Sequence, residues 1–197
     1  MPSLPPTKTD QLSSLSSADS LSTNNKQSLG AIQGRPLPNS LEAEQGLLAA
    51  CIHDSSGEVI GRCIEQAIAS DHFYDQSHQL IYEALLALHK ENLEADEIIL
   101  SDKLSDLGNL DRVGGREFLI ELTSKIETIA HAPFWLDIVK QKAILRRCIY
   151  VAFEIIDDAN QLQGNMDDFL AAIEQRVCSL GDQTNVRSSV PFREPVN

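Results

Sequence analysis

Residues 148–156 read CIYVAFEII, a run in which only Glu154 is charged. On a helix, positions i, i+3, i+4 and i+7 share one face, which here holds Ile149, Ala152, Phe153 and Ile156. A second face holds Cys148, Val151, Ile155 and Ala159. The remaining polar stripe is narrow. A helix that is apolar over most of its circumference needs cover on more than one side.

The chain on both sides of this run predicts a helical hairpin. Pro133 suits the start of a long helix, and no helix-breaking residue follows before about Asn160. Gly164-Asn165 then predicts a turn, and a second helix follows with apolar residues at coiled-coil-like spacing, namely Met166, Phe169, Leu170, Ile173, Val177 and Leu180. These two helices are expected to form an αα-hairpin.

The hairpin leaves open what covers the rest of the long helix. One reading is that the globular part of the same chain covers it; the other is that a second subunit does. Under the second reading the hairpin mediates a dimer, and the predicted subunit interface consists of Ile149, Ala152, Phe153, Ile156, Met166, Phe169, Ile173 and Val177.

Upstream of the hairpin, the apolar spacing predicts further helices at about 57–69, 77–90 and 96–107. A first helix is expected after a cap at Asn39 or Ser40, with Glu42 and Glu44 in its first turn. Gly114-Gly115 predicts a turn. No segment shows convincing period-two alternation beside hairpin signals. The expected fold class is therefore all-α, a compact helical subdomain followed by a long αα-hairpin.

Composition predicts four segments. Residues 1–38 contain eight Ser, five Pro and no aromatic residue, which is typical of a disordered extension. The helical subdomain is expected at 39–130 and the hairpin at 131–181. Residues 182–197 are interpreted as the start of a linker.

Charge argues against strong nucleic-acid binding by this chain alone. Residues 40–181 hold 25 Asp and Glu against 11 Lys and Arg, whereas proteins that bind phosphate backbones neutralise them with Lys and Arg. One basic concentration stands out, formed by Lys140, Lys142, Arg146 and Arg147. It is interpreted either as a solvated helix face or as a docking site for an acidic partner surface.

No motif in the sequence predicts catalysis, a cofactor or a metal. There is no Gly-Lys pair and hence no phosphate-binding P-loop. Cys51, Cys63, Cys148 and Cys178 form no CxxC and are expected as reduced, partly buried thiols. His72 and His78 are expected to cap or pack. Since no signal peptide or 18-residue apolar run is evident, we expect a cytoplasmic protein away from membranes.

Five ordered blocks carry a family resemblance: 38–54 (PNSLEAEQGLLAACIHD), 73–88 (FYDQSHQLIYEALLAL), 96–122, 136–155 (LDIVKQKAILRRCIYVAFEI) and 190–196 (VPFREPV). In this order and spacing they closely resemble the N-terminal domain of the bacterial replicative DNA helicase, the DnaB family. Two features depart from the family: the long serine-rich extension, and a chain that stops at Asn197.

The resemblance implies a hairpin that pairs with a second copy, and a collar on a hexameric ring where primase docks; a helicase loader is a further possible partner. ATP and magnesium would belong to a motor domain absent from this sequence. Two alternatives stay open. One is a free-standing interaction protein related to the collar, and the other is a small helical enzyme or metal protein.

Overall fold

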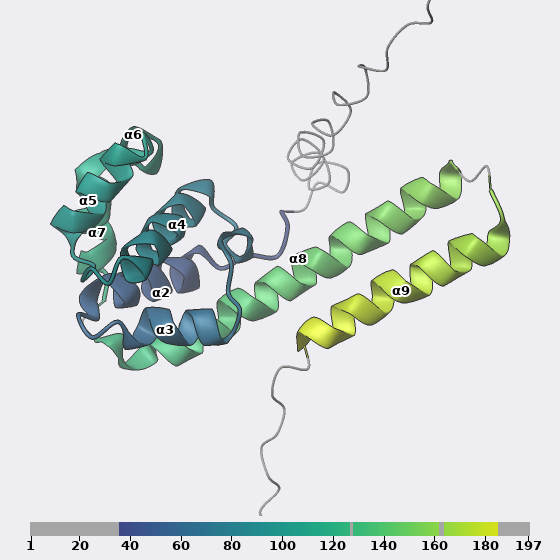
Figure 1. Ribbon diagram of the computed structural model, residues 1–197, viewed down its shortest axis with the longest axis horizontal. Helices are drawn as coiled ribbons and strands as arrows, with labels where there is room; N and C mark the ends of the chain where they lie inside the picture. Colours follow the sequence, from purple (N-terminus) through teal and green to yellow (C-terminus); the bar gives the residue numbers. More distant parts are fainter. Residues whose placement is uncertain (1–35, 127, 162–163, 185–197) are drawn as a thin grey trace, which may run out of the picture. The chain divides into compact units, whose positions relative to one another are not determined.

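The computed structural model describes residues 36–126, 128–161 and 164–184, and every regular element in those ranges is helical. The chain divides into two units, Met1–Leu37 and Pro38–Asn197, and the described helices all belong to the second. The all-α prediction is confirmed (Figure 1).

The globular subdomain is built around α2 (Leu41–His53), which is buried on nearly all sides. Around it pack α3 (Glu58–Glu65), α4 (Gln76–Lys90), α7 (Gly115–Ser124) and the start of α8 (Ala132–Asn160). The remaining elements are α5 (Glu97–Asp106), α6 (Leu110–Val113) and two 3-10 turns, η1 (Ser70–His72) and η2 (Ile129–His131). From Gly46 to Ile52 the sequence of α2 has no polar side chain, as is typical of a helix enclosed by its neighbours.

Local capping explains where these helices begin. Ser40 accepts a hydrogen bond from Ala43 N at 3.4 Å, Asp75 from Ser77 N at 2.8 Å, and Asp96 from Ile99 N at 2.7 Å. Each is a side-chain oxygen that satisfies an otherwise unpaired amide of a first helical turn. These caps fix the starts of α2, α4 and α5, which lie within one or two residues of the predicted ones.

The prediction was wrong for the end of the second helix. It was expected to reach Ala69, but α3 ends at Glu65. Ala67 adopts φ of 55°, in the left-handed region, and Ile68 turns back into the core with 5% of its surface exposed. A residue in the left-handed region cannot continue a right-handed helix, so the chain changes direction at Ala67.

Helix α2 approaches α8 closely at one glycine. A Cβ on Gly46 would lie 2.6 Å from the indole ring of Trp135, which is far shorter than a van der Waals contact. Only a residue without a side chain permits this approach.

Candidate partner interface

Helix α8 consists of two segments with different surroundings. Over 29 residues, or about 43 Å, it runs from beneath the globular subdomain into the hairpin (Figure 1). The first segment buries a single face at a spacing of four and three residues, namely Ala132, Leu136, Val139, Ala143 and Arg146. Beyond Arg146, the only residue of α8 classed as buried is Val151. The second segment therefore protrudes from the core.

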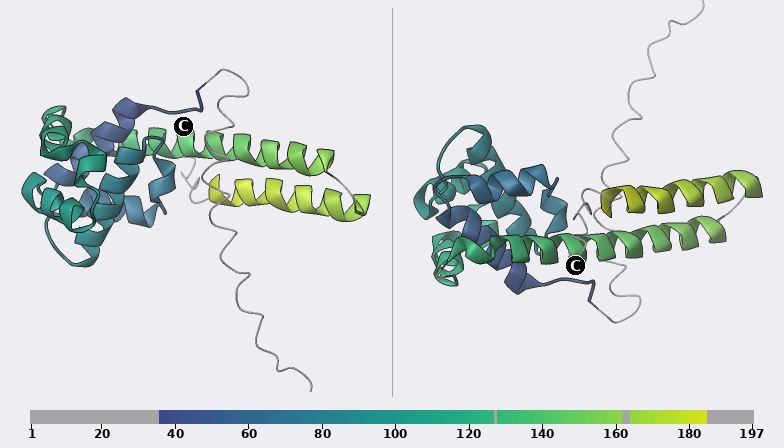
Figure 2. Two further views of the ribbon diagram at one scale, coloured as in Figure 1. Left: turned by 90° about the horizontal axis from the view of Figure 1, so that it is seen from above. Right: turned by 90° about the horizontal axis from the view of Figure 1, so that it is seen from below.

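Helix α9 (Met166–Thr184) covers one side of that second segment. The two helices lie side by side in each view (Figure 2). Arg176 of α9 pairs with Asp158 of α8 at 2.6 Å. Val151 and Ile155 precede Asp158 by seven and three positions, so they lie on the same side of α8. Val151 is 3% exposed, so this side of the second segment is covered.

A neighbouring side of α8, about a quarter of a turn from the side that α9 covers, is apolar and exposed. Leu145, Cys148, Ala152 and Ile156 recur at intervals of three or four residues and are all exposed. Leu145 is 48% exposed and Ile156 is 55% exposed. We call this set the α8 row.

Helix α9 carries a matching set. Met166, Leu170 and Val177 share one side of the helix and are 54%, 50% and 52% exposed. We call them the α9 row. Phe169 and Ile173 lie beside it and are half-buried. Two neighbouring helices that both expose apolar rows are typical of a protein–protein contact surface.

The predicted interface residues all lie on this hairpin, and none of them is buried within the chain. Four are half-buried (Ile149, Phe153, Phe169 and Ile173), and four are exposed (Ala152, Ile156, Met166 and Val177). Sequence reasoning did not assign Leu145, Cys148 and Leu170 to the predicted interface, although they are exposed on the same hairpin. Their spacing relative to Ile156 and Val177 was the signal that could have included them.

The predicted basic cluster is not a single surface feature. Arg147 is exposed and Lys140 and Lys142 are half-buried, but Arg146 is only 4% exposed. The prediction of Arg146 as a docking residue was therefore wrong. It lies on the face of α8 that packs against the globular subdomain, as its spacing from Val139 and Ala143 indicates.

Arg146 instead joins three separate regions of the chain. Its guanidinium donates hydrogen bonds to the carbonyl oxygens of Pro38 at 2.9 Å and His72 at 2.6 Å. It also lies over the ring of Tyr74, 5.8 Å from the centroid, a cation–π arrangement. Burial lowers the pKa of Arg146, and the nearby Glu44 carboxylate opposes that shift.

Glu44 is a second buried charged residue that sequence reasoning missed. It was assigned to the helix dipole, yet it is 1% exposed. Its carboxylate accepts hydrogen bonds from Tyr74 N at 2.8 Å and Asp75 N at 3.3 Å, and pairs with His78 Nδ1 at 2.8 Å. A buried carboxylate needs such partners. His78 thus has the packing role expected of it.

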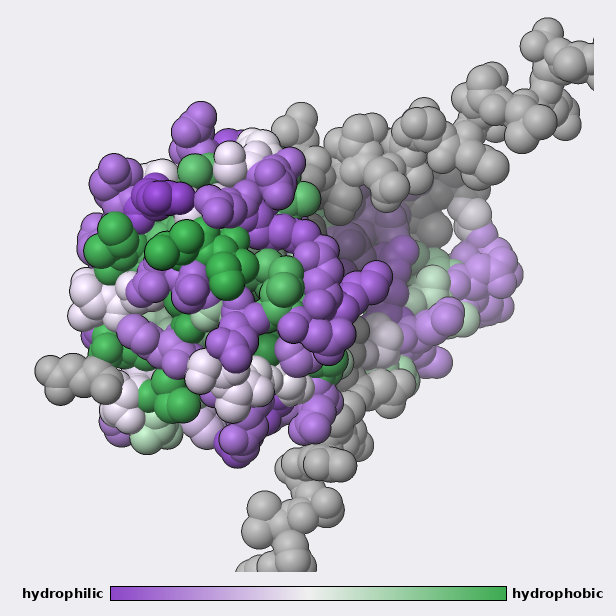
Figure 3. All heavy atoms as spheres, turned by 60° about the vertical axis from the view of Figure 1, so that its left-hand side comes forward, coloured by the Kyte–Doolittle hydropathy of each residue, from purple (hydrophilic) through white to green (hydrophobic). Residues whose placement is uncertain are grey.

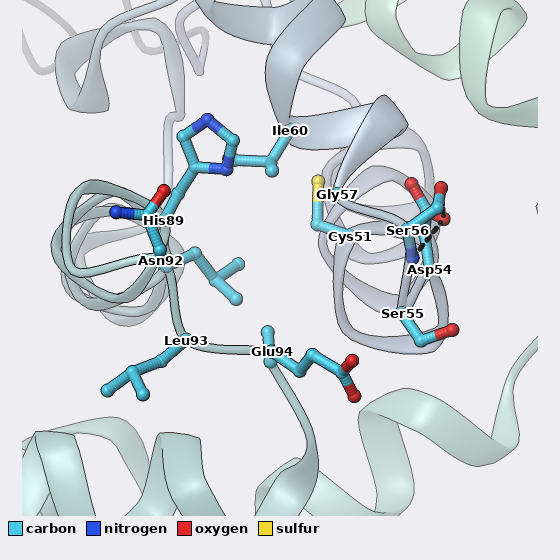
Figure 4. Close-up of a pocket in the computed structure, with 12 residues that line it drawn as sticks. Cys51, Asp54, Ser55, Ser56, Gly57, Ile60, His89, Asn92, Leu93 and Glu94 are labelled. Atoms are coloured by element: carbon cyan, nitrogen blue, oxygen red, sulfur yellow. Dashed lines mark hydrogen bonds between the residues drawn. The ribbon is translucent and has the colours of Figure 1, made fainter.

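The described residues of the globular subdomain line at least two hollows. One, of about 290 Å³, is lined mainly by apolar residues of α2, α3, η2 and α8. The other, of about 210 Å³, lies between the C-terminal end of α2, the start of α3 and residues 89–95 (Figure 4). In the described stretches of the chain, no three His, Cys, Asp or Glu side chains converge as a metal site. None of the described helices is long and apolar enough to cross a membrane.

Comparison with known proteins identifies the family. The family model for the DnaB-like helicase N-terminal domain matches residues 36–141. The chain belongs to this family. The N-terminal domain of DnaB helicase from Mycobacterium tuberculosis has a similar structure, with a TM-score of 0.68 and 26% identity, over 73% of this chain and 99% of that one.

Full-length relatives are longer than this chain. It is 32% identical to the replicative DNA helicase DnaB of Leifsonia xyli over 82% of its own length and 35% of that protein. It is 29% identical to the replicative DNA helicase DnaC of Bacillus subtilis over 75% of its length and 32% of that protein. The chain thus spans about one third of the curated helicases it matches. The resemblance to the DnaB N-terminal domain is confirmed.

Proposed function

We propose that this domain assembles through its hairpin into the N-terminal collar of a hexameric replicative helicase, in the bacterial cytoplasm. The observation that carries the proposal is the pair of uncovered apolar rows on α8 and α9. Between Leu145 and Ile156 the α8 row extends about 16 Å. A second copy of the hairpin offers the same rows, and a two-fold contact is self-complementary.

The test is a charge placed where the apolar rows are most exposed. Ile156→Glu and Val177→Glu substitute residues that are 55% and 52% exposed, so the single chain should keep its helix content. Burying an unpaired carboxylate costs several kcal/mol, enough to separate two copies. Sedimentation with circular dichroism should show folded monomers for both variants and a dimer for the wild type.

Ile98→Glu provides the matched control, because Ile98 is 63% exposed but lies on α5, away from the hairpin. It should assemble like the wild type. A wild-type chain that stays monomeric at high micromolar concentration contradicts self-assembly. If both hairpin variants lose helix content, Ile156 and Val177 instead stabilise the fold of the single chain.

We further infer that this collar docks primase, with Lys140, Lys142 and Arg147 at the contact. Support comes from the family and from a structure titled as a DnaB-like replicative helicase and its interactions with primase, whose fold is similar at a TM-score of 0.54 and 18% identity. Charges at the rim of a contact mainly set association rate and salt dependence.

Replacing the three residues by Glu should weaken binding of the C-terminal helical domain of primase and reduce its salt dependence. Lys90→Glu, at an exposed position on α4, is the control. If the triple variant binds with unchanged affinity and unchanged salt dependence, these three residues do not take part in the contact. The same assay can include a helicase loader as a second partner.

We also propose that this chain carries no nucleotide chemistry of its own and binds DNA only weakly. The sequence has no Gly-Lys pair for a phosphate cradle, and ATP and magnesium are assigned to the motor of the longer relatives. The alternative function, a free-standing interaction protein related to the collar, also predicts no ATP turnover and weak DNA binding. ATP turnover that stays with the purified chain, or submicromolar binding to single-stranded DNA, would contradict both.

A further inference from the structure

The globular subdomain has a second surface with the character of a binding site, at the C-terminal end of α2. Glu94 and Ala95, just before α5, line a hollow together with Cys51 and Asp54 of that end. The last turn of α7 also lies against the C-terminal end of α2, because Nε2 of His53, the last residue of α2, is 2.9 Å from the carbonyl oxygen of Thr123 in α7. The start of α5 and the end of α7 are therefore neighbours, and the two helices run in opposite directions.

Two isoleucines are exposed on the outer side of this helix pair. Arg116 of α7 bonds to Ser101 at 3.0 Å and to Asp102 at 3.1 Å, both on α5. Ile98 lies one turn before Asp102 and Ile120 lies one turn after Arg116, so both are on the side that carries this ion pair. They are 63% and 59% exposed.

The end of the globular subdomain that carries Ile98 and Ile120 is also hydrophobic in part. Figure 3 shows hydrophobic side chains gathered in a band across the end of the globular subdomain that carries α5, α6 and α7, between hydrophilic ones. Leu93, which is 49% exposed, adds an apolar side chain just before α5. Single exposed apolar residues are common, whereas a group rimmed by polar residues indicates a contact surface.

The charge around these residues is strongly acidic. Residues 91–124 contain nine Asp and Glu against three Lys and Arg. Two of the three cations are already paired, Lys103 with Glu91 at 2.6 Å and Arg116 with Asp102. Among the described residues, Glu94, Glu97 and Glu117 have no ion-pair partner. The surface thus presents apolar side chains with uncompensated negative charge beside them.

The hollow that Leu93 and Glu94 line, just before α5, provides room for a side chain. It measures about 210 Å³, and Leu93, Ile60 and Cys51 contribute to its walls. Glu94 lies beside Leu93 at its edge (Figure 4). A lysine or arginine is suited to such a place, because its long aliphatic stem packs on apolar atoms while its charged end reaches a carboxylate.

We propose that this surface, formed by Leu93, Glu94, Ile98 and Ile120 and here called the α5–α7 surface, binds a basic amphipathic helix of another protein. Nucleic acids and anionic membranes are disfavoured because their phosphates would face Glu94, Glu97 and Glu117. A second copy of the same surface is disfavoured because residues 91–124 carry nine Asp and Glu against three Lys and Arg, so two such surfaces would repel each other. The site is separate from the hairpin and does not depend on self-assembly.

The test uses the full chain and a defined probe, a labelled synthetic helix of about 15 residues with Lys and Arg on one face and Leu on the other. Binding is measured by fluorescence anisotropy at two salt concentrations, and the site is mapped by amide chemical shifts. The double variant Ile98→Ser with Ile120→Ser should lower affinity at least tenfold. Changing Glu94, Glu97 and Glu117 to Gln should flatten the salt dependence.

Two controls decide the outcome. A peptide of the same composition with its apolar residues scrambled should bind at least tenfold more weakly. Val177→Ser, at a similarly exposed position on the hairpin, should leave affinity unchanged. The proposal is overturned if the two peptides bind equally, if neither binds, or if the largest shifts fall on α8 and α9. Sedimentation of the same variants separates this result from hairpin assembly, which the α5–α7 substitutions should not alter.

Discussion

The guanidinium of Arg146 donates a 2.6 Å hydrogen bond to the carbonyl oxygen of His72, although 74 positions separate the two residues. A second bond from the same group reaches Pro38 O. Arg146 is also the last of the evenly spaced buried residues on the first segment of α8. This side chain therefore secures the globular subdomain to the helix that continues into the hairpin.

Replacing Arg146 by Met should lower the free energy of unfolding by about 2–3 kcal/mol, because two partly buried carbonyl groups lose their donor. The adjacent Arg147→Met should change it by less than about 0.5 kcal/mol, since Arg147 is exposed. Urea unfolding followed by circular dichroism measures both. Equal effects at the two positions would show that the bonds to Pro38 and His72 contribute little.

Glu44→Gln should destabilise the fold by about 1–3 kcal/mol. The carboxylate faces the amides of Tyr74 and Asp75 and the ring of His78. An amide NH₂ in its place turns a donor toward donors. Glu42→Gln, in the same helical turn but exposed, should cost less than about 1 kcal/mol. Thermal unfolding of the two variants side by side tests this, and a larger loss at Glu42 would contradict it.

Gly46→Ala should lower the free energy of unfolding, whereas Gly61→Ala should raise it. At Gly46 the new methyl group would lie 2.6 Å from Trp135, and such overpacking costs about 1–3 kcal/mol. At Gly61, inside α3, a Cβ meets nothing within 4 Å, so alanine should stabilise by about 0.5–1 kcal/mol. Trp135 is the only tryptophan, and its fluorescence should shift only in the Gly46 variant. An unshifted spectrum there would rule out the close contact.

The four cysteines should react with a thiol reagent in two groups. Cys148 and Cys178 are exposed, whereas Cys51 and Cys63 are buried. The hydrogen bond with Cys63, together with burial, raises the pKa of Cys51, which further slows a reaction that needs the thiolate. Two thiols should therefore react quickly, and the other two only on unfolding. Four fast thiols in the folded chain would contradict the packing of α2 against α3.

The same reagent reports on assembly, because Cys148 belongs to the α8 row. Its reaction should slow as protein concentration rises, while that of Cys178, which lies off the α9 row, should not. Cys148→Ser and Cys178→Ser assign the two signals. A Cys148 rate that does not depend on concentration would place the contact elsewhere.

The sequence by itself determined the helices and the hairpin. Hydrophobic spacing in 148–156, the turn at Gly164-Asn165 and the cap at Ser40 are local signals, because a helix depends on contacts within a few residues. The apolar faces of the hairpin also follow from the spacing of its hydrophobic residues. The family follows from the order of the sequence blocks along the chain.

Only the tertiary structure decided the roles of Glu44 and Arg146. Both looked like surface charges in their own helices, and their partners lie at least 30 positions away. Ile98 and Ile120 likewise became one surface only when α5 and α7 packed in opposite directions. Burial, hydrogen bonding between distant segments and the meeting of two helix faces depend on how the helices pack, which local spacing does not specify.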